Sequence, residues 1–206
     1  MADSLVRRSP LQGYESRFAS MPTTAFVIDE PFVSMGDLWV DPAGSGGRAA
    51  ADVLGVDALP TAASTVVAVP DGAVIWLGPQ EWLITSVRGN GEDVEAALRD
   101  AVSEHGGAAV DVSAQRTTLR LSGAHARDVL AKGCSLDLHP AVFAAGAAVQ
   151  TTLGHAGVVL MPLSDNGSDF RIIVRSSFAR YLADWLIDAT IEFGSDVEAA
   201  AASRQR

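Results

Sequence analysis

The sequence predicts an α+β protein in which two similar units, each strand, helix, three strands and helix, pack as one body. Three observations predict this fold. Short apolar runs bounded by turn residues indicate strands, amphipathic segments that end at glycine indicate helices, and both halves of the chain carry these elements in the same order. Apolar residues make up 48% of the 206 residues, a proportion typical of a globular chain with a substantial core.

The first half reads from a short strand to a helix that ends the unit. The turn residues Pro70, Asp71 and Gly72 separate two apolar runs, and acidic residues in the first turn followed by a terminal glycine pair delimit a helix. We expect strands at 37–40, 64–69, 73–78 and 81–87, helices at 47–55 and 92–107, and a strand at 108–113 where the chain crosses to the second unit.

The second half repeats that order. Gly133 ends its first helix, and Ser176 or Ser177 caps its last helix, whose apolar stripe includes Leu182 and Leu186. We expect strands at 116–123, 149–154, 157–163 and 169–175, and helices at 124–133 and 176–194.

Direct comparison of the halves supports a duplication. Three pairs of segments match in order: 51–60 with 127–140, 67–79 with 151–163, and 81–87 with 169–175. Because one unit alone could cover only part of its apolar surface, the two units are expected to bury their sheets against each other.

These patterns divide the chain into segments. Residues 1–22 are expected to be extended or bound to a partner. The body is expected to span 23–194, with repeats at about 23–112 and 113–194. The remainder, 195–206, contains no large apolar residue after Val197 and is expected to form a disordered tail.

Charge and composition exclude several classes of function. The net charge of −10 argues against nucleic acid and against an anionic membrane surface as a partner. No apolar run is long enough for a membrane-spanning helix, and the basic N-terminal residues precede no apolar run, so we expect a cytoplasmic protein without a secretory signal. Cys134 is the one cysteine, which excludes an intramolecular disulfide and a cysteine-based zinc site.

The candidate chemical groups favour structural interpretations. Asp111 and Ser113 lack a G-x-S-x-G context and more often end a strand. The segment 44–49, "GSGGRA", fits a dinucleotide loop in letters only, because a long preceding strand is absent, and a flexible connector is favoured. A buried, inert thiol is favoured for Cys134.

The histidines give no indication of a metal site, because none shows the spacing of a helical ligand pair. They are His105, His125, His139 and His155. We therefore predict no catalytic, cofactor-binding or metal-binding residue in this chain.

Two pairs of residues are candidates for contact with another protein. Trp76 and Trp82 offer large aromatic surfaces, although core packing explains them equally well. Arg116 and Arg120 alternate with Thr118 on one face of a strand, where they would either meet an acidic partner or lie in solvent.

One family resemblance covers most of the chain, from about Arg8 to Gly194. The segment 110–140, "VDVSAQRTTLRLSGAHARDVLAKGCSLDLHP", resembles the signature region of the gamma subunit of heterotetrameric sarcosine oxidase. "RRSPL", "GPQEWLI" and "FRIIVRSSFARYLADWLIDA" are similar to that subunit in the same order. The pattern D-V-S followed by L-S-G-x-x-A-R-x-V-L also resembles the folate-binding aminomethyltransferase, or glycine cleavage T-protein, superfamily.

The resemblance implies a non-catalytic subunit and an aminomethyltransferase-like fold. It implies a complex that demethylates sarcosine to glycine, forming 5,10-methylenetetrahydrofolate and hydrogen peroxide. The other subunits, alpha, beta and delta, would hold FAD, FMN, NAD, tetrahydrofolate and zinc, and alpha would be the main partner. The alternative is a free-standing, folate-binding aminomethyltransferase-like protein, although the chain is about half the length that such an enzyme needs.

Overall fold

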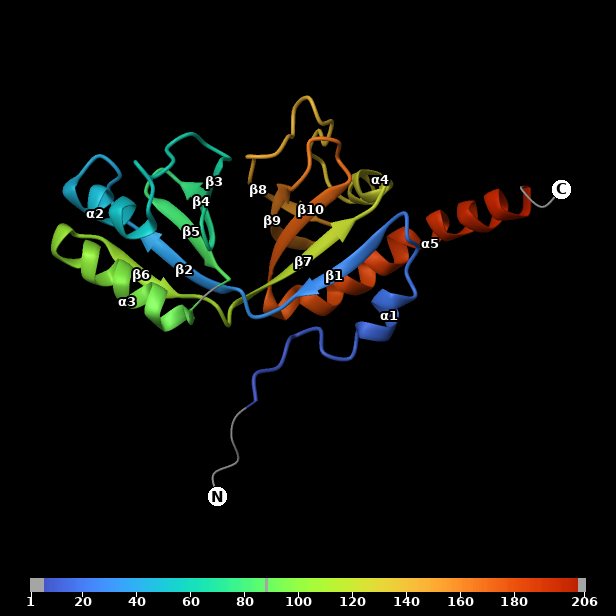
Figure 1. Ribbon diagram of the computed structural model, residues 1–206, viewed down its shortest axis with the longest axis horizontal. Helices are drawn as coiled ribbons and strands as arrows, with labels where there is room; N and C mark the ends of the chain where they lie inside the picture. Colours follow the sequence, from blue (N-terminus) through green and yellow to red (C-terminus); the bar gives the residue numbers. More distant parts are fainter. Residues whose placement is uncertain (1–5, 88, 204–206) are drawn as a thin grey trace, which may run out of the picture.

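The computed structural model describes residues 6–87 and 89–203, which form two five-stranded sheets with helices on their outer sides (Figure 1). Every pairing between neighbouring strands is antiparallel. Helices α2 and α3 lie at one end of the molecule and α4 and α5 at the other, with the sheets between them. The α+β class and the two-unit architecture are therefore confirmed.

The first sheet is built from the first half of the chain and one strand beyond it. Its order is β3-β4-β5-β2-β6. The bounds are β2 Ser34–Trp39, β3 Val66–Val69, β4 Gly72–Gly78, β5 Glu81–Ser86 and β6 Ala108–Asp111. Its helices are α2 Ser45–Leu54 and α3 Gly91–Val102, followed by the short helix η1 Ser103–His105.

The second sheet has the order β1-β7-β10-β9-β8. Its strands are β1 Phe26–Glu30, β7 Arg116–Ser122, β8 Val149–Leu153, β9 Ala156–Pro162 and β10 Asp169–Arg175. The accompanying helices are α1 Glu15–Ala19, α4 Ala126–Ala131, η2 Ser176–Phe178 and α5 Ala179–Ser203.

The two halves exchange one strand each. β1 precedes β2 in the chain but pairs with β7, so that Phe26 lies opposite Ser122. β6 precedes β7 but pairs with β2, so that Trp39 lies opposite Ala108. Each half thus reads strand, strand, helix, three strands and helix, and the repeat boundary falls before β6 rather than after residue 112. The strand β1 was absent from the sequence prediction.

Three apolar clusters fill the spaces between these layers. One lies between the first sheet and α2 and α3, and a larger one lies between the second sheet and α4 and α5. The third lies between the two sheets themselves and includes Met35, Ile75, Leu83, Met161 and Ile173. Because side chains alternate along a strand, each sheet turns one apolar face to its helices and the other toward the opposite sheet.

Local sequence explains where several helices begin and end. Asn90 caps α3 by accepting a hydrogen bond from the Asp93 backbone N–H at 2.8 Å. Gly55 ends α2 with a left-handed φ of 68°, a conformation that favours glycine.

Both ends of the body differ from the sequence prediction. Leu11 and Tyr14 are buried in the larger outer cluster, and the Tyr14 hydroxyl lies 3.1 Å from Oδ1 of Asp184 on α5. Residues 9–22 therefore fold onto the body instead of extending from it. Helix α5 continues to Ser203, where a disordered tail was expected, because the alanine-rich segment has high helix propensity. Residues 1–5 and 204–206 of the predicted terminal segments lie outside the described residues.

Candidate functional site

Two cavities of about 280 Å³ each have walls on the faces that the sheets turn toward each other. The first cavity, lined by Glu30, Ile75, Thr118 and Arg171 among others, draws residues from both sheets. The second cavity is lined by β7, β8, β9 and β10 of the second sheet and by the last residue of η2: Arg116, Gln150, Thr151, Gly157, Val158, Val159, Arg175 and Phe178. Charged side chains in this region are the strongest candidates for a functional site.

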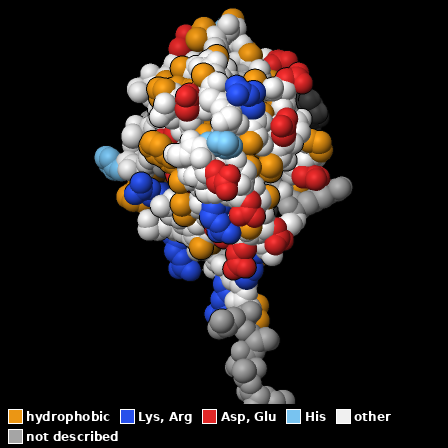
Figure 2. All heavy atoms as spheres, turned by 90° about the vertical axis from the view of Figure 1, so that its left-hand side faces the viewer, with side chains coloured by type: hydrophobic (Ala, Val, Ile, Leu, Met, Phe, Trp, Pro, Cys, Tyr) orange, Lys and Arg blue, Asp and Glu red, His pale blue; other side chains and the backbone are white. Residues whose placement is uncertain are grey.

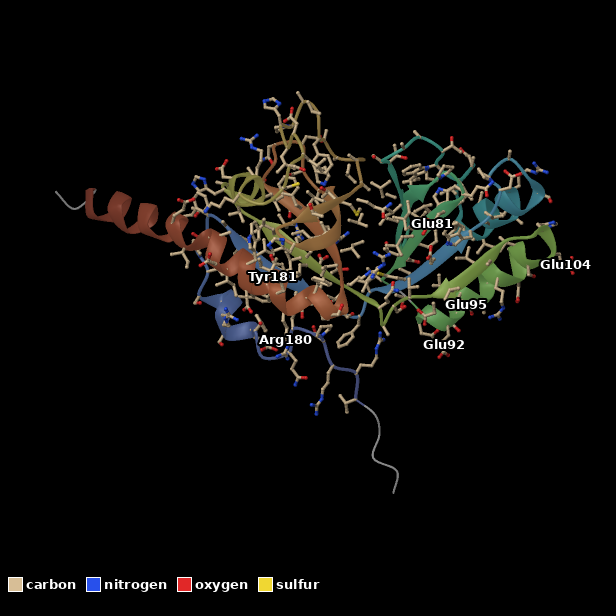
Figure 3. The ribbon with its side chains drawn as sticks, turned by 180° about the vertical axis from the view of Figure 1, so that it is seen from behind. Glu81, Glu92, Glu95, Glu104, Arg180 and Tyr181 are labelled. Atoms are coloured by element: carbon tan, nitrogen blue, oxygen red, sulfur yellow. The ribbon has the colours of Figure 1, made fainter. Side chains whose placement is uncertain are left out.

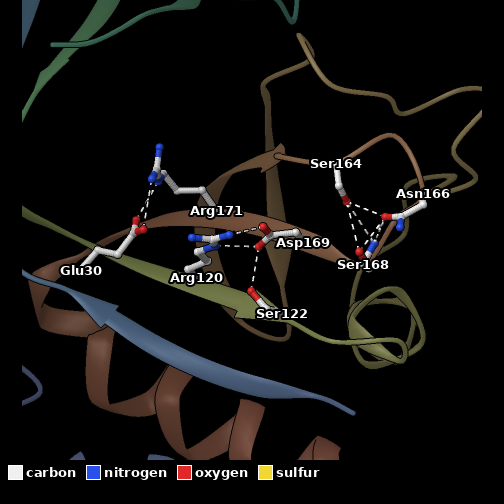
Figure 4. Close-up of polar contacts among 8 residues, drawn as sticks. All are labelled: Glu30, Arg120, Ser122, Ser164, Asn166, Ser168, Asp169 and Arg171. Carbon is white, nitrogen blue, oxygen red and sulfur yellow. Dashed lines mark hydrogen bonds and ion pairs between the residues drawn. The ribbon is translucent and has the colours of Figure 1, made fainter. Parts of the chain in front are cut away.

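Near the first cavity, the charged residues are paired within the chain (Figure 4). Arg120 donates from Nε to Oδ1 of Asp169 at 2.8 Å and from Nη2 to Oδ2, and the Ser122 hydroxyl donates to Oδ1 at 2.7 Å. Arg171 donates two hydrogen bonds to Glu30, at 2.7 and 3.1 Å.

These contacts determine the protonation of Asp169. Burial raises the pKa of Asp169, but the hydrogen bonds from Arg120 and Ser122 outweigh that effect and hold the pKa below its ordinary value of 3.8. Arg120, an interface candidate from the sequence, is therefore committed to an ion pair within the second sheet.

Arg116 lies in a different environment. Its guanidinium is half-buried, and its Nε has no hydrogen-bond partner among the residues that the structure describes. Burial lowers the pKa of Arg116 and repulsion from Arg175 acts in the same direction, while Asp37 and Glu81 oppose both. Sequence reasoning did not single out Asp37, Glu81 or Arg175, because their proximity to Arg116 depends on the packing of the two sheets.

The two acidic neighbours are themselves desolvated. Burial raises the pKa of Asp37, and burial together with the nearby Asp37 charge raises the pKa of Glu81. Glu81 begins β5 of the first sheet (Figure 3). No hydrogen bond or ion pair joins either carboxylate to Arg116 within 6–87 and 89–203.

The two tryptophans lie opposite each other across β4 and β5. Trp82 is fully buried, and its indole N–H donates to the Pro60 carbonyl at 2.8 Å. Trp82 is thus a core residue, which corrects its selection as an interface candidate. Trp76 is half-buried against the apolar cluster between the first sheet and its helices, to which Trp82 also belongs. The indole nitrogen of Trp76 has no hydrogen-bond partner among the described residues.

Asp111 and Ser113 form a turn at the end of β6. Oδ1 of Asp111 accepts from the Ser113 backbone N–H at 2.9 Å and from its hydroxyl at 2.5 Å. The Ser113 hydroxyl oxygen also accepts from the Met35 backbone N–H at 2.9 Å. Because these bonds tie the crossing segment to β2, the strand-ending interpretation of this pair agrees with the structure.

The segment 44–49 forms the start of α2 instead of a flexible connector. Gly46 and Gly47 are buried in its first turn. A Cβ at Gly47 would lie 2.6 Å from the Pro42 carbonyl oxygen, and one at Gly46 would lie 2.7 Å from a methyl group of Val40. Close packing of the helix start therefore accounts for both glycines.

Figure 2 shows the outer face at this end of the molecule, where acidic, basic and hydrophobic side chains are interspersed.

The remaining candidates are separated in space. His105 lies 3.0 Å from the Ser45 hydroxyl, and His125 lies 2.9 Å from Asp128 and stacks on Phe193. Cys134 is partly exposed, and its sulfur lies 4.0 Å from the Thr151 hydroxyl. No cluster of three or more His, Cys, Asp or Glu with metal-binding geometry occurs in the described part of the chain. Nor does any helix there have the length and apolar character needed to cross a membrane.

Solved structures show which class of fold this is. The chain superimposes on the glycine cleavage system aminomethyltransferase T from Bartonella henselae with a TM-score of 0.58 and 16% identity, covering 86% of this chain and 49% of that one. The architecture is therefore of the aminomethyltransferase type, and it corresponds to about half of that structure.

A closer likeness is to a chain in the structure of heterotetrameric sarcosine oxidase from Corynebacterium sp. U-96 in complex with pyrrole 2-carboxylate. The TM-score is 0.83 and the identity 32%, covering 92% of this chain and 97% of that one. Sarcosine oxidase subunit gamma from Corynebacterium sp. (strain P-1) is 34% identical over 93% of both chains, and that from Arthrobacter sp. is 34% identical over 92% and 93%. The model of the sarcosine oxidase, gamma subunit family matches residues 36–192. The chain belongs to the sarcosine oxidase, gamma subunit family.

Proposed function

We propose that this chain is the gamma subunit of a heterotetrameric sarcosine oxidase, and that it supports the complex structurally without supplying a catalytic group. The complex would oxidatively demethylate sarcosine to glycine and form 5,10-methylenetetrahydrofolate and hydrogen peroxide. The observation that carries this proposal is the likeness, at a TM-score of 0.83 over almost the full length of both chains, to a chain of heterotetrameric sarcosine oxidase.

The contacts of the candidate groups support a structural role. Asp111 and Ser113 direct their hydrogen bonds to each other and to β2, and Asp169 accepts from Arg120 and Ser122. Side chains held in this way stabilise strand pairing within each sheet and are poorly placed to exchange protons with a substrate.

Within the complex, we expect the alpha, beta and delta subunits to be the partners, with alpha the main one. FAD, FMN, NAD, tetrahydrofolate and zinc would be held by those subunits, and assembly would take place in the cytoplasm. The alignment with only 49% of the aminomethyltransferase structure supports this division, because a pocket that needs the whole of that fold would be incomplete here. Arg116 and Trp76 stay candidates for partner contact.

Co-expression tests the proposal. With an affinity tag on this chain and untagged alpha, beta and delta subunits from the same source, we expect all four to elute together with sarcosine oxidase activity. A tagged, unrelated protein of similar size serves as the control for carry-over. If the chain elutes as a stable monomer while the other three subunits form a complex without it, the proposal is wrong.

The free-standing, folate-binding alternative makes a separate prediction. It requires the isolated chain to bind tetrahydrofolate, which isothermal titration calorimetry measures directly. We expect no binding heat from the isolated chain beyond the heat of dilution, and saturable binding would favour the alternative.

A further inference from the structure

We infer that the cavity between Arg116 and Arg175 receives a carboxylate side chain, Asp or Glu, from a partner subunit. The inference rests on the proposed function, since it presumes that this chain assembles with other subunits. It adds the place on this chain and the chemistry of one contact. The cavity is the second one described above, and we call it the arginine pocket.

The arginine pocket is bounded by a pair of like charges. Arg116 at the start of β7 and Arg175 at the end of β10 lie directly opposite each other in the sheet register. Like charges in directly opposite positions repel and weaken a sheet, and an anion beside Arg175 would offset that repulsion. Within the described residues, neither arginine forms an ion pair.

One donor of Arg116, which lines the pocket, is desolvated and unused. The Nε of Arg116 is buried without a hydrogen-bond partner among the described residues, an arrangement that costs free energy. Asp37 and Glu81 are the acidic groups near Arg116, but they act on it through space and leave this donor unpaired. A carboxylate entering from the side of Arg175 would accept hydrogen bonds from the guanidinium groups and neutralise their mutual repulsion.

The dimensions and the rim of the pocket favour a protein side chain. A volume of about 280 Å³ suits a carboxylate side chain but lies just under the range of cofactor and drug-sized sites. Gln150, which lines the wall, is held by its own hydrogen bond to the Leu77 carbonyl at 2.8 Å. Phe178 lies at the rim and is 42% exposed, and Arg175 is also exposed. Exposed aromatic and arginine side chains beside a polar pocket are typical of protein–protein contacts.

The first test replaces Arg175 with glutamine, which removes one charge and keeps a similar length. We expect the variant to bind the alpha, beta and delta subunits at least about tenfold more weakly than the wild-type chain. The isolated Arg175→Gln chain should be as stable as wild type or slightly more stable, because the repulsion with Arg116 is gone. That stability measurement separates lost binding from lost folding.

Arg48→Gln is the matched control. Arg48 is an exposed arginine of α2 that donates to the Ala43 carbonyl at 3.2 Å and lies in the helical layer of the first sheet. The control removes the same charge away from the pocket and should leave both affinity and stability unchanged. If wild type assembles and Arg175→Gln assembles with equal affinity, the inference is overturned while the proposed function stands. If wild type itself does not assemble, the proposed function fails first.

The second test identifies the partner carboxylate. Lys132 is the one lysine in the sequence, so an Arg175→Lys chain carries a new primary amine against a nearly amine-free background. A carbodiimide, which joins an amine to a carboxylate without a spacer, should couple position 175 to an Asp or Glu of a partner in the assembled complex. Mass spectrometry would then name that residue. An Arg48→Lys chain should give no such product, and the same absence for Arg175→Lys in an assembled complex would overturn the inference.

Discussion

Replacing Trp82 with phenylalanine should destabilise the isolated chain by about 2–4 kcal/mol. The substitution removes the indole N–H that donates to the Pro60 carbonyl at 2.8 Å. An acceptor left unpaired in a buried position costs about 1–3 kcal/mol. The smaller ring leaves a void in a position with 0% exposure, which adds about 1 kcal/mol.

Urea denaturation followed by circular dichroism measures this loss. With a denaturant slope of about 2–3 kcal/mol per M, the unfolding midpoint should fall by about 1 M. Trp39→Phe is the matched control, because Trp39 is 50% exposed and should lose about 1 kcal/mol or less. Equal midpoints for wild type and Trp82→Phe would refute the assignment of Trp82 to the core, and so would equal losses in the two variants.

Three further predictions follow from other contacts. Asp169→Asn should lower the free energy of unfolding by about 2 kcal/mol at pH 7. Because the folded-state pKa of Asp169 lies below the unfolded value of 3.8, this difference from wild type should persist above pH 3.8 and shrink as the pH falls through the folded pKa. Urea unfolding midpoints measured across pH check this. Gly47→Ala should lower stability by about 1–3 kcal/mol because its Cβ would meet the Pro42 carbonyl, whereas Gly157→Ala, with no atom within 4 Å of its Cβ, should change the urea midpoint little. Lys132→Met should lose the hydrogen bond to the Ala189 carbonyl, the ion pair with Glu192 and the contact with the Phe193 ring. Amide hydrogen exchange near residues 189–194 should therefore accelerate. Unchanged exchange would contradict the role of Lys132 in holding this part of α5.

Much of the fold follows from local signals in the sequence. The turn at Pro70–Gly72 places β3 beside β4, and Asn90 and Gly55 mark helix ends. The matched segments 67–79 and 151–163 form the hairpins β3–β4 and β8–β9, which occupy equivalent places in the two sheets. Such features depend on residues close together in the chain, and a single sequence is enough to predict them.

The exchange of strands depends on distant residues and was not predicted. The segment 26–30 is short and is followed at once by Pro31, so its pattern alone gives a weak strand signal. Nothing local indicates that Phe26 pairs with Ser122.

The interface candidates show the same limit. Alternation placed Arg116, Thr118 and Arg120 on one face, and Arg116 and Thr118 do line the two cavities. The surroundings of each side chain on that face depend on tertiary packing. Arg120 pairs with Asp169, whereas Arg116 lines the arginine pocket. Burial separates Trp82 from Trp76 for the same reason, although the two lie opposite each other in the hairpin.

The strand exchange has a consequence for synthesis on the ribosome. When the first half has emerged, β1 has no partner and the β2 edge of the first sheet is open, since β7 and β6 are both still to come. Unpaired strands and open sheet edges are sites of pairing between chains. Neither half can complete its own sheet, so the nascent chain stays open to association with a second copy until the second half is made. Chaperone binding and the rate of translation across residues 108–122 should therefore affect the yield of folded protein, while the stability of the finished fold stays the same.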